Sequence, residues 1–239
     1  MRRLQALLLL TWLLVAPQAS ADERAGTPDD WPPPMHDPGP FWMVQGDRFE
    51  STLGESGNHY SWDLQGWYGY DRRRLRFKSE GEGEWGERSD DAELQLLYSQ
   101  LVAPYWEWQL GIRHDFRPAD GRSFAVAGLQ GMAPYLFEID AAFFLSQDGD
   151  LSARFEAEYD LLITQKLILQ PRFEADLAFS DVAALGIRGG DFGTGLGLRL
   201  RYELRREIAP YLGFSLERRR DALGTRTDNA FIAGLHFWF

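Results

Sequence analysis

The sequence predicts an all-β fold: an antiparallel β-barrel of about twelve strands that crosses an outer membrane and carries a short N-terminal periplasmic arm. Three observations favour this fold. Residues alternate in character along many segments, the N-terminus carries an export signal, and aromatic residues make up 14% of the 239 residues, with 9 Trp. Aromatic rings gather at the two interfaces of membrane barrels, so this content is typical of the class.

The last nine residues show the alternation most clearly. Five of them share one face of a strand and four share the other. In a soluble protein such a terminal strand would be an exposed edge, whereas barrel closure pairs the edge and lipid covers the apolar face. The first face holds Phe231, Ala233, Leu235, Phe237 and Phe239, and the second holds Ile232, Gly234, His236 and Trp238.

The N-terminus has the features of a secretory signal. Arg2 and Arg3 precede the apolar run Leu7–Val15, and residues 19–21 form an A-x-A cleavage site. No other run reaches the roughly 18 to 20 apolar residues that a membrane helix needs, so we expect the chain to cross a membrane as strands. The expected organisation is a signal peptide over residues 1–21, a flexible periplasmic arm over residues 22–40 and a transmembrane barrel over residues 41–239.

Composition limits the possible functions. A mean hydropathy of -0.36 with 26% charged residues fits a barrel in which every second residue faces a polar lumen. The formal net charge of -11 argues against nucleic acid as a partner. The chain has no Cys, which excludes thiolate metal sites and Cys nucleophiles. The alternative fold for an aromatic-rich secreted chain is a soluble β-sandwich.

Residues 192–205 form the clearest internal strand. Mostly apolar residues at even positions oppose glycines and charged residues at odd positions, as expected between lipid and a crowded polar interior. Segments 135–145, 151–161 and 167–177 repeat this scheme. The first strand begins near Phe41 or Tyr60. Turns are expected at Ala103-Pro104, 118–121, Ala133-Pro134, 148–150, Ala209-Pro210 and Leu223-Gly224, and the longest loops at 51–59 and 181–191.

The inward positions carry charges of both signs. One interpretation is that these side chains fill a narrow lumen with ion pairs, because buried charges must be paired. The other is an acidic path for cations, densest where Arg154 lies among carboxylates. The residues proposed for this path are Glu138, Asp140, Glu156, Glu158, Asp160 and Glu174.

Several stretches resemble the copper resistance protein B family of bacterial outer-membrane proteins. They include residues 75–84 (LRFKSEGEGE), 133–140 (APYLFEID), 154–160 (RFEAEYD), 201–211 (RYELRREIAPY) and 234–239 (GLHFWF), in order along nearly the whole mature chain. The resemblance implies an outer-membrane barrel that contributes to copper tolerance by binding or exporting copper ions beside periplasmic copper-handling proteins. It does not specify the molecular mechanism.

Family members usually carry a Met- and His-rich region before the barrel, and this chain departs from that pattern. Only Met35, His36 and Met43 remain there, with His59 in the following loop. Thioether and imidazole groups suit copper, so these residues form a candidate site for weak or transient copper binding. The alternative is that the two methionines are ordinary apolar residues beside the first strand.

Two more histidines are candidate metal ligands. His236 is expected to point inward, where it could reach Glu217 on the neighbouring strand, or simply form a hydrogen bond in the lumen. His114, beside Asp115 near the rim, could serve a cation entrance. No organic cofactor is expected.

Partners and alternative functions follow from the same features. We expect contact with outer-membrane lipid, recognition of the C-terminal strand by the barrel assembly machinery and an encounter with a periplasmic copper-handling protein. One alternative function is a passive barrel or docking platform that binds its partner through the acidic arm. Another is an outer-membrane lipid hydrolase, but no G-x-S-x-G motif occurs and the only Ser-His pairs, such as His114 with Ser123, would be accidental.

Overall fold

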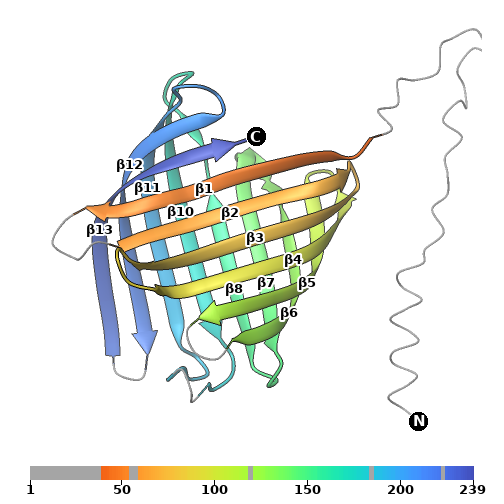
Figure 1. The fold of residues 1–239 in the computed structure, drawn as a ribbon, viewed down its shortest axis with the longest axis vertical. Coiled ribbons are helices and arrows are strands. Elements are labelled where there is room, and N and C mark those ends of the chain that lie inside the picture. The colour runs from red at the N-terminus through yellow and green to blue at the C-terminus, as the bar shows by residue number, and fades with distance from the viewer. Residues whose placement is uncertain (1–38, 54–58, 118–120, 183–185, 222–223) are drawn as a thin grey trace, which may run out of the picture. The chain divides into compact units, whose positions relative to one another are not determined.

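The computed structural model describes residues 39–53, 59–117, 121–182, 186–221 and 224–239. These residues form a closed antiparallel barrel (Figure 1). Twelve strands build the wall when the two-residue β9 is counted as a continuation of β8. The elements are β1 (Phe41–Leu53), β2 (His59–Tyr70), β3 (Arg73–Glu84), β4 (Ser89–Ala103), β5 (Trp106–Arg117), β6 (Arg122–Ala133), the 3₁₀ turn η1 (Pro134–Leu136), β7 (Phe137–Ser146), β8 (Leu151–Glu158), β9 (Leu161–Leu162), β10 (Leu167–Ala178), β11 (Phe192–Tyr202), β12 (Ile208–Asp221) and β13 (Gly224–Trp238).

Closure joins the first strand to the last. β1 pairs antiparallel with β13, from Gln45 opposite Trp238 to Leu53 opposite Phe231. The backbone amides of Val44 and Phe239 each donate to the carbonyl oxygen of the other residue, at 2.9 and 2.8 Å. The C-terminal strand predicted from the sequence therefore closes the barrel, and no free edge remains between β1 and β13.

Pro171 accounts for the interruption between β8 and β9. It lies within β10 and has no amide proton to donate to a neighbouring strand. On the facing strand, the ladder stops after Glu158 and resumes at Leu161. Tyr159 still donates its amide to the Pro171 carbonyl oxygen at 3.2 Å. One proline thus divides a single barrel strand without opening the wall.

The two ends of the barrel differ. Both ends of the described barrel chain lie at one end, called here the terminal end, where turns such as Asp71–Arg72 and Pro104–Tyr105 have two residues. The opposite end, the loop end, carries the longest connection, residues 179–191. Since outer-membrane barrels have short periplasmic turns and longer external loops, the terminal end corresponds to the periplasmic side.

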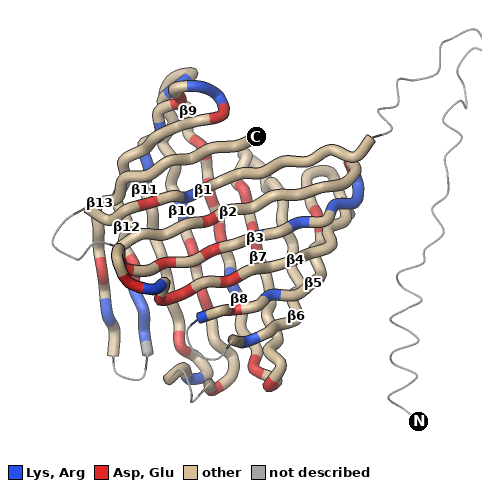
Figure 2. Tube along the Cα trace, viewed as in Figure 1, with Lys and Arg blue, Asp and Glu red and all other residues tan. Residues whose placement is uncertain are grey.

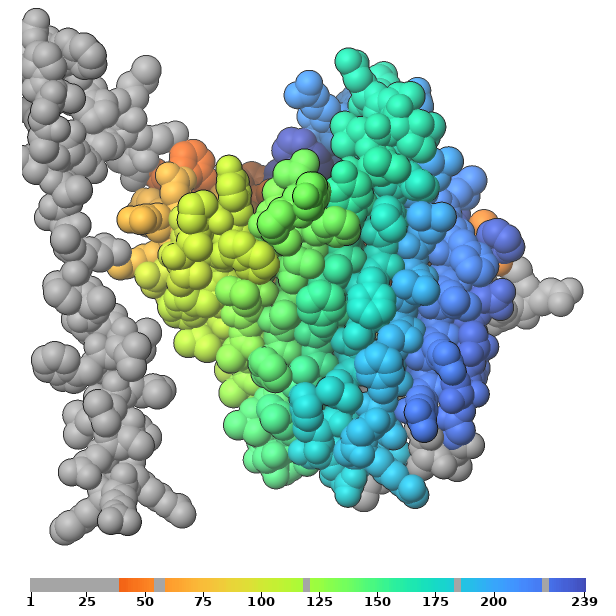
Figure 3. Space-filling model, turned by 180° about the vertical axis from the view of Figure 1, so that it is seen from behind, coloured from red at the N-terminus to blue at the C-terminus, as the bar shows by residue number. Residues whose placement is uncertain are grey.

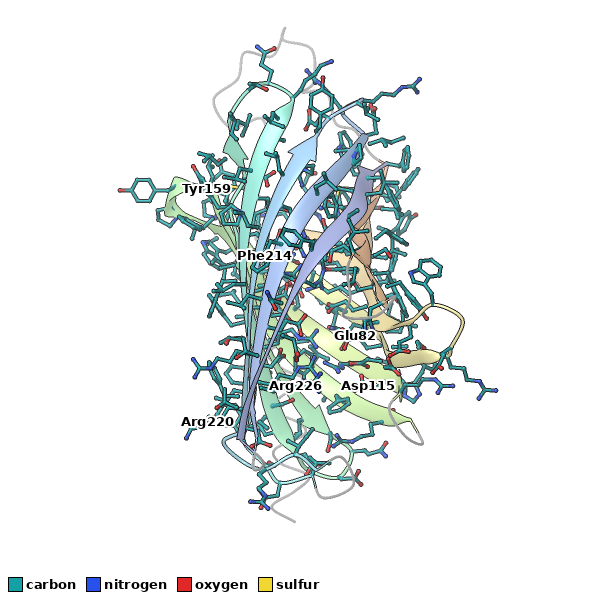
Figure 4. All side chains as sticks on the ribbon, turned by 90° about the vertical axis from the view of Figure 1, so that its left-hand side faces the viewer. Glu82, Asp115, Tyr159, Phe214, Arg220 and Arg226 are labelled. Carbon is teal, nitrogen blue, oxygen red and sulfur yellow. The ribbon has the colours of Figure 1, made fainter. Side chains whose placement is uncertain are left out.

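The outer wall is apolar. Figure 3 shows the strands packed into a continuous surface on the face seen there. Figure 4 shows Tyr159 projecting away from this wall. Exposed aromatic rings cluster near the terminal end, as expected at a membrane interface. They include Phe41, Trp42, Tyr68, Tyr70, Tyr105, Tyr135, Phe137, Tyr202, Trp238 and Phe239.

A small apolar cluster fills one sector of the interior. Leu97, Phe124, Val126 and Phe144 are all buried and pack together. The Arg113 guanidinium lies over the Phe144 ring, with its carbon 4.8 Å from the ring centroid. Elsewhere in the described interior most positions are polar, with Ile168, Ala209, Tyr211 and Ile232 as further buried apolar residues. The apolar residues of the described strands therefore mainly serve the outer face.

Several sequence-based boundaries were wrong. Ala209-Pro210 lies inside β12 and is not a turn, because Pro210 needs no amide donor at its position in the ladder. β11 ends at Tyr202 instead of Arg205, and the first loop is shorter than expected because β1 continues to Leu53 and β2 begins at His59. Among the described residues, no helix is long and apolar enough to span a membrane.

Gly111 on β5 provides a test of the strand packing. A Cβ added there would lie 2.8 Å from the Leu97 Cα and closer still to the Leu96 carbonyl oxygen, both of them backbone atoms. We expect Gly111→Ala to lower the free energy of unfolding by about 1–3 kcal/mol, measured by urea denaturation in detergent. Gly193→Ala is the matched control, since its nearest atom, Asp176 Cβ, is 3.7 Å away, and it should leave stability unchanged. Equal loss in both variants would contradict the packing explanation.

Candidate cation path in the barrel lumen

Strand alternation directs the charged side chains inward. Charged residues of both signs are distributed along the strands, as the coloured trace in Figure 2 shows. Antiparallel register then aligns inward residues of neighbouring strands, so that Glu138 lies opposite Glu158, and Asp140 opposite Glu156. Glu156 in turn lies opposite Glu174. Carboxylates that are distant in the sequence therefore form adjacent rows on one inner wall.

Two arginines, Arg154 and Arg172, join this wall to the opposite one. Arg154 on β8 binds Glu80 on β3 at 3.0 Å and Glu93 on β4 at 3.3 Å. β8 and β3 are five strands apart along the sheet, so this pair crosses the lumen.

Arg172 on β10 forms the second crossing, and Arg48 on β1 binds the same carboxylate from the neighbouring strand. The Arg172 guanidinium lies 3.6 Å from Asp63 on β2, and Arg48 lies 3.2 Å from the same carboxylate. Arg172 also binds Glu156 at 2.6 Å and Glu158 at 3.0 Å on its own side. We call this set the ion-pair belt: Arg48, Asp63, Glu80, Glu93, Arg154, Glu156, Glu158 and Arg172.

Further ion pairs brace the interior on either side of the belt. Lys78 on β3 pairs with Asp140 on β7, again across the lumen. Arg199 binds Glu50 at 2.5 Å, and the Tyr211 hydroxyl donates to the same carboxylate at 3.0 Å. The expectation that mixed charges bridge a narrow lumen therefore describes much of this barrel.

The belt separates two cavities. The terminal cavity has a volume of about 650 Å³ and extends to Asp71 and Tyr105 in the turns. The loop cavity has a volume of about 600 Å³ and extends to residues 186–187 of the longest loop. Arg154 and Glu80 of the belt line both cavities. The ion pairs thus form the constriction between two polar vestibules.

Both cavities carry an excess of negative charge. Nine carboxylate residues and five basic residues line the terminal cavity. Eight carboxylate residues and four basic residues line the loop cavity. Such an excess in a confined, low-dielectric space attracts cations and repels anions.

Most residues proposed for the acidic path line these cavities. Glu138, Asp140, Glu156 and Glu158 border the terminal cavity. Glu174 borders the loop cavity. Asp160 instead pairs with Arg201 near the terminal end of the wall.

The candidate copper ligands near the N-terminus do not form one observed site. Met35 and His36 lie outside the described residues. Met43 occupies β1 opposite Trp67, on the inward face that also holds Gln45. His59 begins β2 at the opposite, loop end, where its imidazole lies 3.9 Å from Glu84. Met43 and His59 are therefore at different ends of the barrel.

His236 points inward as predicted, but its expected partner was wrong. Its Nδ1 lies 3.7 Å from Asp47 on β1. Glu217 is opposite Asp228, eight positions along β13 from His236, because β12 and β13 run antiparallel in that register. His236 therefore belongs to the terminal half of the lumen, whereas Glu217 lines the loop cavity.

His114 lies on the outer face, between the inward residues Arg113 and Asp115. Its Nδ1 is 2.9 Å from the Ser123 hydroxyl, and its ring contacts Phe116. In the part of the chain that the structure describes, no carboxylate or amide contacts its other ring nitrogen. The side chain is therefore separate from the lumenal path, and the pair has no third group to orient it.

Within the described residues, no group of three or more His, Asp or Glu side chains has the arrangement of a metal site. The carboxylates are spread over the inner wall and most are engaged by arginine. The geometry therefore offers diffuse attraction for cations and not a closed coordination shell.

Sequence reasoning missed several lumenal residues on β1 and one on β6. β1 is irregular between Gly46 and Glu50, so its inward residues do not follow a period of two. The residues missed for this reason are Asp47, Arg48 and Glu50. Met132 was also missed; it lines the terminal cavity and supplies a thioether there. Met132 shares a strand face with Gly128 and Gln130, which point inward, so the alternation along β6 could have identified it.

Comparison with known proteins agrees with the fold and the resemblance. The chain is 38% identical to Copper resistance protein B of Escherichia coli, over 94% of this chain and 78% of that protein. It is 34% identical to a Copper resistance protein B homolog of Pseudomonas syringae pv. tomato, over 94% of this chain and 79% of that protein. A NanC porin structure is similar in fold, with a TM-score of 0.53 at 14% identity, covering 82% of this chain and 99% of that one.

The family match covers the barrel. Residues 40–239 match the family described as Copper resistance protein B precursor (CopB), and a precursor agrees with the predicted signal peptide. A closed, porin-like barrel with a lipid-facing apolar wall lies in the outer membrane, as the sequence predicted. This chain belongs to the copper resistance protein B family.

Proposed function

We propose that the barrel contributes to copper resistance by admitting copper ions into its acidic lumen and passing them across the outer membrane. The observation that best supports this function is the excess of carboxylates in both cavities, on either side of the ion-pair belt. A copper ion entering from either end would meet attractive charge before reaching the belt.

Weak, distributed ligands suit passage better than storage. Conduction requires sites that attract an ion but do not hold it tightly. The described lumen offers carboxylates along both vestibules, with the Met132 thioether and the His236 imidazole in its terminal half. Thioether sulfur favours Cu(I), and imidazole and carboxylate accept Cu(II), so the vestibule can meet either oxidation state.

The belt controls the proposed passage. Arg154 and Arg172 cross the lumen through ion pairs, so an ion can pass only if these side chains rearrange. When an arginine moves away, carboxylates such as Glu80 and Asp63 lose their positive partner. A bound cation can replace it and so offset the loss of the ion pair. The same arginines repel cations when they remain in place.

A docking platform for a periplasmic copper-handling protein is the second candidate function. Tyr105 and Tyr135 lie in turns at the terminal end, each with φ of 67°. They are 74% and 86% exposed. Strained backbone conformations cluster at functional sites, and aromatic side chains are enriched at protein interfaces, which supports a periplasmic contact here. This role needs no ion flow, so transport measurements separate the two candidates.

We propose no catalytic role. A serine hydrolase needs a base oriented by a third group, and the His114–Ser123 pair lacks one among the described residues. Because Ser123 lies opposite His114 on the outer face, Ser123→Ala should leave ion flux unaltered.

The first test asks where copper binds. Three proteins are compared: the full mature chain, a chain that lacks residues 22–40, and the triple variant Met35→Ala/His36→Ala/Met43→Ala. Each is titrated calorimetrically with Cu(II), and with Cu(I) under reducing conditions. The truncation spares β1, which closes the barrel. For lumenal passage we expect weak binding that survives both changes, because the cavity carboxylates remain.

Loss of all copper binding with the arm would instead place the ligands at Met35 and His36 and favour the docking role. The Met43→Ala single variant separates the arm from the strand, since Met43 lies in β1. Folding of each protein is checked by its gel migration before and after heating.

The second test concerns cation selectivity. Glu138 lines the terminal cavity and forms no ion pair within the described residues, so changing it leaves no arginine unpaired. In planar bilayers with a salt gradient, Glu138→Gln should lower the cation-to-anion permeability ratio, and Glu138→Lys should lower it further. Copper flux into liposomes should fall in the same order. Glu87→Gln, in the exposed β3–β4 turn, is the control and should match the parent. Identical ratios in all four proteins would count against the lumenal path.

The third test addresses the belt. Arg172→Gln removes the link to Asp63 and frees Glu156 and Glu158, so we expect higher single-channel conductance. It should also lower the free energy of unfolding by about 1–3 kcal/mol, because charges are left without partners. Arg219→Gln is the control: its side chain is 68% exposed and its ion pairs are 3.7 Å long. Unchanged conductance in Arg172→Gln would show that the belt does not limit passage.

A further inference from the structure

Two arginines near the loop end of β12 face away from the lumen. Arg218 and Arg220 are exposed and lie on the same strand face as Leu212 and Phe214, which are 63% and 36% exposed to lipid. Arg219 points the other way and contacts Glu82 from inside the barrel. Figure 4 shows Arg220 at the outer edge of the wall, where it also borders the mouth of the loop cavity.

The two side chains lie just beyond the lipid-facing apolar band. On β12 this band runs from Ile208 to Leu216. Eight residue steps at about 3.4 Å each, tilted by roughly 40°, span roughly 20 Å along the membrane normal, close to the ~25 Å height typical of such bands. Arg218 therefore lies at the level where lipid headgroups begin.

The residues directly across from these arginines on the neighbouring strands carry no charge. Thr194 and Thr227 flank Arg218 on the neighbouring strands, and Phe192 and Thr225 flank Arg220. In the described parts of the chain, no carboxylate forms an ion pair with either arginine. Arg226 of the same hairpin, by contrast, is paired with Asp228 at 2.8 Å.

We propose that Arg218 and Arg220 bind phosphate groups of the lipids in the membrane leaflet at the loop end. Arginine binds phosphate through two parallel hydrogen bonds, and the pair on one strand face is about 6.8 Å apart at the backbone, which suits one or two phosphates. The flanking threonine hydroxyls can donate to the same oxygens. The external leaflet of an outer membrane is built from phosphorylated glycolipid, so its headgroups have the required charge at the required depth.

The test compares two double variants of the same hairpin. Arg218→Gln/Arg220→Gln removes two positive charges from the outer face, and Arg219→Gln/Arg226→Gln removes two from the lumenal face. The full mature chains, folded in detergent, are titrated with diphosphoryl lipid A and with dephosphorylated lipid A, and retained lipid is measured by native mass spectrometry. Inorganic phosphate is titrated in parallel.

We expect the parent to prefer diphosphoryl lipid A, and the outer-face variant to bind it on the order of tenfold more weakly. The lumenal-face variant should bind like the parent, and heat-dependent gel migration should show that both variants fold. Equal affinity of the parent and the outer-face variant would overturn the proposal, as would equal weakening in both variants. Binding of inorganic phosphate as tight as that of lipid A would overturn the assignment to lipid.

Discussion

The need to pair every backbone amide and carbonyl in lipid governs the whole structure. Only a closed sheet meets this need with strands, and the pairing of β1 with β13 provides the closure. Once the sheet is closed, its period-two alternation divides each strand between lipid and lumen. Charged residues of opposite walls then face one another across a narrow space. The ion-pair belt is thus a consequence of closure as much as of the residues that form it.

The sequence predicted the faces of strands better than their partners. Alternation correctly placed Arg154, Arg172 and Arg199 inside, because side-chain direction depends only on local geometry. The pairing of Arg154 with Glu80 requires knowledge of which strands oppose each other, and this follows only from closure. His236 was assigned the wrong carboxylate for the same reason. The irregular segment from Gly46 to Glu50 hid lumenal residues, because a bulge breaks the period on which the reasoning relied.

Charge balance along the lumen distinguishes a path from a plug. If the charges served only to fill the interior, acidic and basic residues would tend to match in number. They do not match: the belt has three arginines and five carboxylates, and acidic residues also outnumber basic ones around both vestibules. Glu138 illustrates the difference, since no arginine pairs with it among the described residues. Because Glu138 is exposed beside the terminal cavity, it leaves negative charge available there without a burial cost.

The segment from Glu217 to Arg220 shows how one strand can serve two surfaces independently. Arg219 pairs with Glu217 and with Glu82 on the lumenal side, whereas Arg218 and Arg220 face the membrane. Because successive side chains point in opposite directions, substitutions on one face leave the other face nearly unaltered. A change in lumenal charge should therefore alter ion selectivity without altering lipid contacts, and the reverse should hold for the outer arginines. Selection can adjust the passage of cations and the anchoring of the barrel separately, within four consecutive residues.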